Sequence, residues 1–501
     1  MTKIRQKTFR AMMCAWAVTL AIVAYASHGR AEVVLMGNEG WEVSMDGSVN
    51  AFAVYADSED SANQVFRVQS GLLPAVFGFN VKAPRVGGLD SLARIGLYPH
   101  IHNYNRQKNK LGENNIGSSL DLREIFFSVS GDKGSLLVGK TLSLYQGKNI
   151  LTDMTLFGVG AVDIGNTLSG STSLGRIGYG YVYPNFNAAI RYRFPEWKNF
   201  NLTVGLYDPS AIRGNNTTRV TRQDTGNGLY RNVHTADVTV GGRTIDAGHN
   251  VILTDAQLTA YQAASETIQG QVVPVAGEFY STAAGGFMQA YTETPTPRLE
   301  GELTHSYHNR RYGVMVDSWL SGMFQSAETD NGTTVDSWGI AGGAQANYRG
   351  VVLTGSGYWG RGLGSVLMLD TDALDITGGA RRHYGFIAQA TYDLGQELPQ
   401  FKGFNVGASL GINFTSASKL EKAVSGTLSS TLNTDNDITI DDDVGYLDRI
   451  HRFNRLFDLM LWYNVNDHLR VGIEYGDQRT SDRSGSEVDT RIFSAGGFFF
   501  F

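Results

Sequence analysis

Two short stretches match motifs that elsewhere carry nucleotide and acyl-transfer chemistry. Residues 134–141 fit the phosphate-loop pattern G-x4-G-K-T, and residues 407–411 fit the nucleophile-elbow pattern G-x-S-x-G. A phosphate loop needs a strand before it and a helix after it, so that backbone amides surround the phosphates. A nucleophile elbow needs a sharp turn from a strand into a helix.

Neither motif has the context that its chemistry requires. The variable positions of residues 134–141 are strand-like, and no helical pattern follows them. Ser409 lies within an alternating segment, where it is expected to be a hydroxyl facing a lumen. We therefore predict no enzyme activity, no cofactor and no metal site. The histidines show no metal-ligand spacing and are expected at solvated lumen or loop positions: His305, His308, His383, His451 and His468.

Many segments of the chain alternate between apolar and polar or small residues, a side-chain period of two. Residues 404–414 alternate Phe, Val, Ala, Leu, Ile and Phe with Asn, Gly, Ser, Gly and Asn, and residues 187–194, 311–320 and 468–475 behave similarly. This period indicates β-strands with one apolar and one polar face. A soluble sandwich would alternate too, with its apolar face inside. Long runs and aromatic residues near strand ends favour the inverted case, in which the apolar face meets lipid.

The start of the chain predicts export. Residues 3–10 carry four basic and no acidic residues, an apolar stretch runs from Ala11 to Ala26, and small-residue cleavage sites follow. This is the pattern of a secretory signal peptide, and we favour cleavage after Ala31. The only cysteine, Cys14, lies inside this segment, so the mature chain is expected to contain neither disulfides nor thiolate metal sites.

The composition narrows the class further. Without residues 1–31 the chain has 37 basic and 48 acidic residues, a formal net charge of −11, which argues against nucleic acid as a partner. Glycine is abundant at 60 of 501 residues and proline is sparse at 10. After residue 31 no apolar run approaches the length of a membrane-spanning helix.

These patterns together predict an all-β fold, a transmembrane antiparallel β-barrel over residues 32–501. Roughly seventeen alternating segments are present, and because bacterial barrels have an even number of strands we predict 16, with 18 as the alternative. Short turns such as residues 131–134 alternate with long polar loops, the longest being the insertion at residues 208–297. An insertion of that length is expected to be functional, folded or partly disordered.

The central segment resembles the Gram-negative bacterial outer-membrane porins. Residues 120–127 and 134–140 look like the fourth and fifth strands of that family, and residues 143–171 look like its third loop, which folds into the barrel and narrows it. Residues 176–186 look like the strand that returns from this loop. The last residue, Phe501, is similar to the terminal residue that the barrel-assembly machinery recognises.

The resemblance implies a homotrimer in the outer membrane, in contact with lipid and lipopolysaccharide. It also implies a water-filled channel for passive diffusion of small hydrophilic solutes and ions. Alternation places Arg191 and Arg193 on the polar face, and the resemblance adds Arg123. Asp153 and Asp163 on the inward loop are the candidate opposing charges, which together would create a transverse field at the constriction.

Several alternatives remain open. One is a substrate-specific channel for a sugar or an anion, and another is a barrel adhesin or structural protein that uses residues 208–297 for binding. A barrel hydrolase would need a Ser/His or acid/His set near one rim, and none has suggestive spacing. Arg470 and Glu474 also point inward by alternation and could simply pair with each other.

Overall fold

The computed structural model describes most of the chain after residue 31. The described ranges are 32–59, 64–101, 120–162, 172–214, 294–328, 334–370, 372–374, 379–416, 451–482 and 487–501, together with short strands between residues 229 and 291. The expected signal peptide lies outside them. No helix among the described residues has the length and apolarity to cross a bilayer.

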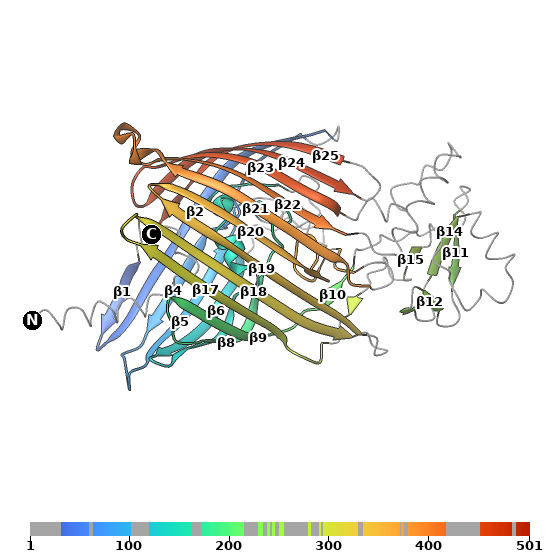
Figure 1. Ribbon diagram of the computed structural model, residues 1–501, viewed down its shortest axis with the longest axis horizontal. Helices are drawn as coiled ribbons and strands as arrows, with labels where there is room; N and C mark the ends of the chain where they lie inside the picture. The colour runs from blue at the N-terminus through green and yellow to red at the C-terminus, as the bar shows by residue number, and fades with distance from the viewer. Residues whose placement is uncertain are drawn as a thin grey trace, which may run out of the picture.

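The alternating segments form a closed, all-antiparallel barrel of 16 strands, which confirms the predicted fold class (Figure 1). The strands are tilted and each pairs with its neighbours in chain order. In that order they are β2 (Trp41–Ser58), β3 (Gln64–Gln69) with β4 (Val76–Lys82) as one interrupted strand, β5 (Asp90–Pro99), β6 (Leu120–Gly131), β7 (Gly134–Leu142), β8 (Phe186–Arg193), β9 (Phe200–Tyr207), β17 (Arg298–Asn309), β18 (Val314–Glu328), β19 (Thr334–Tyr348), β20 (Val351–Arg361), β21 (Arg382–Asp393), β22 (Phe404–Thr415), β23 (His451–Asn464), β24 (Leu469–Asp482) and β25 (Glu487–Phe500).

The barrel closes where the first long strand meets the last. β2 pairs with β25 from Ser48↔Phe500 to Ser58↔Thr490, and on its other edge with β3 and β4. The backbones of Gly47 and Phe501 exchange two further hydrogen bonds, of 2.7 and 3.0 Å. β1 (Val33–Asn38) continues this pairing along β2 beyond Phe501. No edge of the barrel wall is left open along this seam, as a sheet in lipid requires.

The two rims of the barrel differ as predicted. One rim, here called the short-turn rim, holds tight connections such as the one between β6 and β7, and the chain's C-terminus lies there (Figure 1). The longest of its connections, between β21 and β22, contains η4 (Leu394–Gln396) and η5 (Pro399–Phe401). The opposite rim holds the long connections.

The expected 208–297 insertion falls between β9 and β17. Its described parts form short strands: β10 (Ile212–Arg213) pairs with β16 (Ala290–Tyr291), β14 (Asn250–Thr254) pairs with β11 (Leu229–Val233) and β15 (Phe279–Ser281), and β12 (Val238–Val240) pairs with β13 (Arg243–Ile245).

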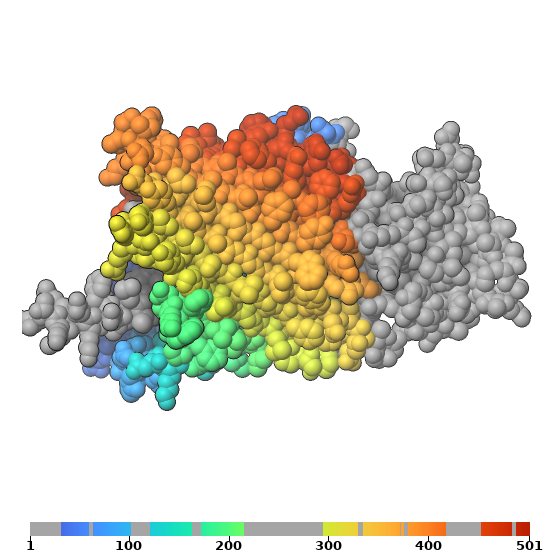
Figure 2. All heavy atoms as spheres, viewed as in Figure 1, coloured from blue at the N-terminus to red at the C-terminus, as the bar shows by residue number. Residues whose placement is uncertain are grey.

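The two faces of the wall have the inverted polarity that alternation predicts. Outward-facing side chains are large, apolar and exposed, for example Leu320, Ile340, Leu353 and Phe386. These belong to β18 through β21, whose outer surface is a continuous wall in Figure 2. Inward neighbours include buried Ser, Thr, Asn and Gln side chains, among them Gln389. Apolar residues therefore cover the surface that a bilayer would contact.

Two segments fill much of the barrel interior. The first lies between β7 and β8 and contains α3 (Gly147–Leu151) and η2 (Met154–Phe157). The second, residues 362–370, 372–374 and 379–381 between β20 and β21, was not predicted from the sequence. Its Leu363, Leu369 and Leu374 are fully buried and pack with Tyr145 of the first segment.

An arginine on the outer face tests which surface meets lipid. Leu320 is 57% exposed in the middle of β18, whereas Val314 begins the same strand at the short-turn rim. Leu320→Arg should destabilise the barrel by about 2–4 kcal/mol, and Val314→Arg by about 0–1 kcal/mol, because the cost of an arginine depends on its depth in the bilayer. Urea unfolding in lipid vesicles, followed by tryptophan fluorescence, measures both; equal losses would contradict this placement of the membrane.

Candidate functional site

The described parts of the first interior segment, residues 143–162 and 172–185, are here called the inward loop. It leaves the wall after Leu142, turns through α3 and η2, and returns to β8. Asp153 caps η2, since its carboxylate accepts a hydrogen bond of 2.9 Å from the Thr155 amide. A cap of this kind satisfies an amide that a short helix leaves unpaired.

One end of the inward loop is fastened to β17. Glu300 faces inward from this strand and its Oε2 accepts hydrogen bonds from the amides of Leu144 (2.8 Å) and Tyr145 (3.0 Å). Its Oε1 accepts a bond of 2.9 Å from Nε of Arg298. All three oxygen contacts are buried, so a charged acceptor here is held by charge-assisted hydrogen bonds.

The middle of the inward loop is fastened to β24, on the far side of the barrel from β17 in strand order. The two carboxylate oxygens of Glu474 accept bonds from the amides of Val159 (2.7 Å) and Gly160 (2.5 Å). Gln478, four residues further along the same face of β24, exchanges two hydrogen bonds with the backbone of Val162. The loop therefore crosses the lumen and is held on opposite walls in the same way. On each wall, one carboxylate accepts hydrogen bonds from two successive loop amides.

The wall approaches the loop closely at Gly158. A Cβ at this position would lie 2.3 Å from Met460 and 2.7 Å from Glu474. The Gly158 carbonyl also accepts a bond of 2.9 Å from the Leu72 amide. A side chain at residue 158 would therefore require the end of the Met460 or Glu474 side chain, or the loop itself, to shift.

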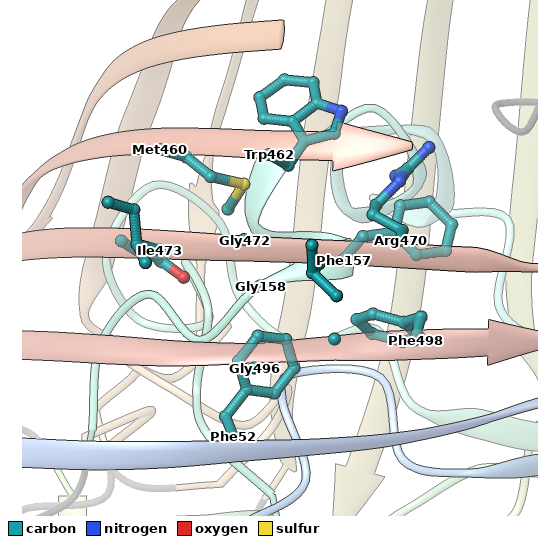
Figure 3. A pocket seen from close by; sticks show the side chains of 13 residues that line it. Phe52, Phe157, Gly158, Met460, Trp462, Arg470, Gly472, Ile473, Gly496 and Phe498 are labelled. Atoms are coloured by element: carbon teal, nitrogen blue, oxygen red, sulfur yellow. The ribbon is translucent and has the colours of Figure 1, made fainter. Parts of the chain in front are cut away.

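A small pocket lies beside this contact. Gly472 on β24 and Gly496 on β25 are paired residues that both face inward, and their neighbours across the sheet are Trp462 and Phe52. Figure 3 shows these aromatic residues, with Phe498, around the two glycines. Phe157 and Gly158 of the inward loop line the same pocket.

Arg470 lies at one end of the pocket (Figure 3). Its guanidinium is 5.2 Å from the ring centroid of Phe157, and its Nε donates to Asn464 at 2.8 Å. Arg470 and Glu474 do not form the pair suggested above as one possibility, because Glu474 is occupied by loop amides.

The predicted loop acid Asp153 is enclosed. It is 4% exposed, accepts bonds from the hydroxyls of Thr155 (2.6 Å) and Tyr181 (2.9 Å), and lies 3.8 Å from Nε of Arg176. Burial raises the pKa of the Asp153 carboxyl above its ordinary value, and the Arg176 charge opposes this. In this position Asp153 stabilises the fold of the loop. It is not exposed to the lumen, so it does not form the charge predicted to oppose the wall arginines. Asp163 lies outside the described residues.

The predicted wall arginines are all on the inner face. Arg123 donates to Asp121 at 2.7 Å and its guanidinium lies 5.3 Å from the Tyr98 ring and 5.6 Å from the Phe186 ring. It also reaches Tyr183 on the returning part of the loop, at 3.4 Å.

Arg191 and Arg193 follow each other along the inner face of β8. Arg191 donates to the Leu142 carbonyl, where the loop leaves the wall, and stacks 5.1 Å from the Tyr207 ring. Arg193 donates to Asn201 at 2.7 Å. The two arginines therefore lie near the point where the loop leaves β7, whereas Arg123 lies near the part of the loop that leads back to β8.

Other predicted positions have mixed outcomes. Ser409 lies inside β22 and binds Arg176, and residues 134–141 lie on β7, so both rejected motifs are parts of strands. His383 is 0% exposed beside the Asp372 carbonyl, so the expected solvated position is wrong for it. No group of three potential metal ligands occurs among the described residues.

Comparisons with known proteins place this architecture. No protein-family model and no curated sequence matches the chain. It is similar to the outer-membrane channel DcaP of Acinetobacter baumannii, with 13% identity, a TM-score of 0.53, and coverage of 94% of this chain and 100% of that one. An anion-selective porin of Comamonas acidovorans shows 12% identity, a TM-score of 0.49 and coverage of 92% and 100%. The similarity to DcaP shows that the two chains share a β-barrel fold.

Removing the β24 anchor should loosen the loop. Glu474→Ala leaves the buried amides of Val159 and Gly160 without an acceptor, at a cost of about 1–3 kcal/mol. Hydrogen exchange of these amides should accelerate roughly tenfold to a hundredfold. Glu474→Gln keeps an acceptor oxygen and should have a smaller effect.

The matched control is Glu397→Ala, the same truncation at an exposed short-turn residue. It should leave the exchange of both amides unchanged. Unaltered exchange in Glu474→Ala would show that the carboxylate does not hold the loop.

Proposed function

We propose that this chain is a porin of the Gram-negative outer membrane, through which small hydrophilic solutes and ions diffuse passively. The observation that carries the proposal is the inward loop, which is tied across a barrel whose outer face is apolar and whose inner face is polar. A barrel of 16 strands is wide enough to leave an aqueous channel.

The inward loop supplies the narrowing that sets the size limit for a solute. Its hydrogen bonds to β17 and β24 hold the loop at a fixed position, and that position determines the largest solute that can pass. The second interior segment occupies further space, because its leucines pack against Tyr145 of the inward loop. Together they favour small solutes over large ones.

Wall cations then act on the solutes that fit. Arg123, Arg191 and Arg193 are the residues proposed to line the narrowed region. Asp153 is not part of this proposal, because it is enclosed within the loop.

Export, assembly and partners complete the proposal. Residues 1–31 direct export, Phe501 marks the terminal strand for the barrel-assembly machinery, and the apolar belt contacts lipid and lipopolysaccharide. The second candidate is a substrate-specific channel for a sugar or an anion. It is supported by the buried clusters inside the barrel, because a narrow lumen contacts its solute more closely than a wide one.

Single-channel recording tests the pore itself. The refolded mature protein in a planar bilayer should give discrete steps whose size rises in proportion to bulk salt, because ions in a water-filled pore carry the current. Heat-denatured protein serves as the control. Absence of steps would contradict an open pore, and steps blocked by low concentrations of one sugar or anion would favour the substrate-specific channel.

Oligomeric state is a separate prediction. Sedimentation of the detergent-solubilised protein, with bound detergent measured, should give the mass of three copies. A monomer mass at the same protein concentration would contradict the trimer implied by the family resemblance.

A further inference from the structure

Two arginines face outward from neighbouring strands at the rim that holds the long connections. Arg361 ends β20 and Arg382 begins β21, and the two residues lie directly opposite each other in the strand pairing. Both are exposed, on the same face of the wall as the exposed Trp359 and Tyr384. Like charges at directly opposite positions destabilise a strand pair, so an anion bound between the two guanidinium groups would stabilise it.

Neither guanidinium has a carboxylate within 4.0 Å among the described residues. Arg361 donates a hydrogen bond of 3.2 Å to the Ala380 carbonyl, which is a neutral group. Asp336 is the only acidic residue on the flanking strands β19 and β22, and it forms no ion pair with either arginine. The positive charge of this pair is therefore not neutralised by the described part of the chain.

Other arginines of the outer face do have carboxylate partners. Arg455 on β23 lies 2.6 Å from Asp477 on β24, and Arg479 on β24 lies 2.5 Å from Asp489 on β25. These charges compensate one another within the sheet. The contrast marks the outer face of β20 and β21 as a place where an external anion can supply the missing partner.

Aromatic rings lie next to the two arginines on the same face. Trp359, two residues from Arg361, has its ring centroid 4.7 Å from that of Trp338 on β19. Tyr384, two residues from the other arginine, stacks on Phe414 of β22 at 5.0 Å. Such aromatic girdles mark the boundary between bilayer and water in barrels. Because two strand residues span about 7 Å, the arginines lie just outside this boundary, at the depth of lipid headgroups.

We infer that Arg361 and Arg382 together bind a phosphate group of lipopolysaccharide in the outer leaflet. This inference rests on the proposed outer-membrane function and specifies where the lipid partner is held. Guanidinium groups bind phosphate through paired, charge-assisted hydrogen bonds, and two of them at opposite positions can hold one phosphate from two sides. The acyl chains of the lipid would lie along the exposed apolar face of β20 and β21, which includes Leu353 and Phe386 and belongs to the wall seen in Figure 2.

The test is a titration of the refolded mature protein in detergent with fluorescently labelled lipopolysaccharide, followed by anisotropy. Binding should saturate, and it should weaken between 0.1 M and 1 M salt, because the screening length falls from about 10 Å to about 3 Å. The same lipid with its phosphates removed should bind at least about tenfold more weakly, because it lacks the groups that accept the charge-assisted bonds. Equal binding of the two lipids would overturn the inference.

Two variants locate the site. Arg361→Gln and Arg382→Gln should each weaken binding of the phosphorylated lipid about tenfold, as expected for the loss of a charge-assisted hydrogen bond. The matched control is Arg310→Gln, because Arg310 is an exposed arginine in the turn between β17 and β18, at the short-turn rim. It should leave the affinity unchanged.

The outcomes separate this inference from the proposed function. Variants that bind the lipid as tightly as the unmodified protein, or a control that weakens binding equally, would overturn the assignment. Conductance steps should persist in all three variants, because none of these arginines faces the lumen. An unmodified protein that conducts but does not bind the lipid would overturn this inference alone, whereas one that binds the lipid but gives no steps would contradict the porin function. If a variant does not fold, the comparison of the two lipids on the unmodified protein decides.

Discussion

The structure depends on one constraint, that no backbone hydrogen-bonding group facing hydrocarbon can remain unpaired. A sheet meets that constraint only when its first and last strands pair, as β2 and β25 do down to the Gly47–Phe501 bonds. Closure makes the interior a separate compartment whose side chains are free to be polar. The inverted polarity of the wall and the polar loop anchors inside it follow from this.

Inside the barrel, two glutamates of the wall hold the inward loop in place. Glu300 and Glu474 each hold two successive amides of a segment that has little regular structure to satisfy them internally. Because those carboxylates accept loop amides, the position of the loop depends on inward-facing side chains of two distant strands.

Alternation along single strands predicted the fold and the inner face well, because side-chain direction in a strand is a local property. It placed Arg191, Arg193 and Glu474 inward, and the structure agrees. Partners within a loop are not local. Neither the enclosure of Asp153 by Tyr181 nor the binding of Glu474 to loop amides has a periodic signal, because both depend on where an irregular segment crosses the barrel. The second interior segment escaped prediction for the same reason.

The Glu474 anchor also has a consequence for the order of events during folding. The inward loop follows β7, early in the chain, whereas its acceptor lies on β24, the strand before the last. The contact with Glu474 cannot form until β24 is in place, when the chain is almost complete, and such a long-range step is slow. Until then the unseated loop and the unpaired edges of β2 and β25 are exposed together, so the nascent barrel depends on being kept from aggregating during that interval.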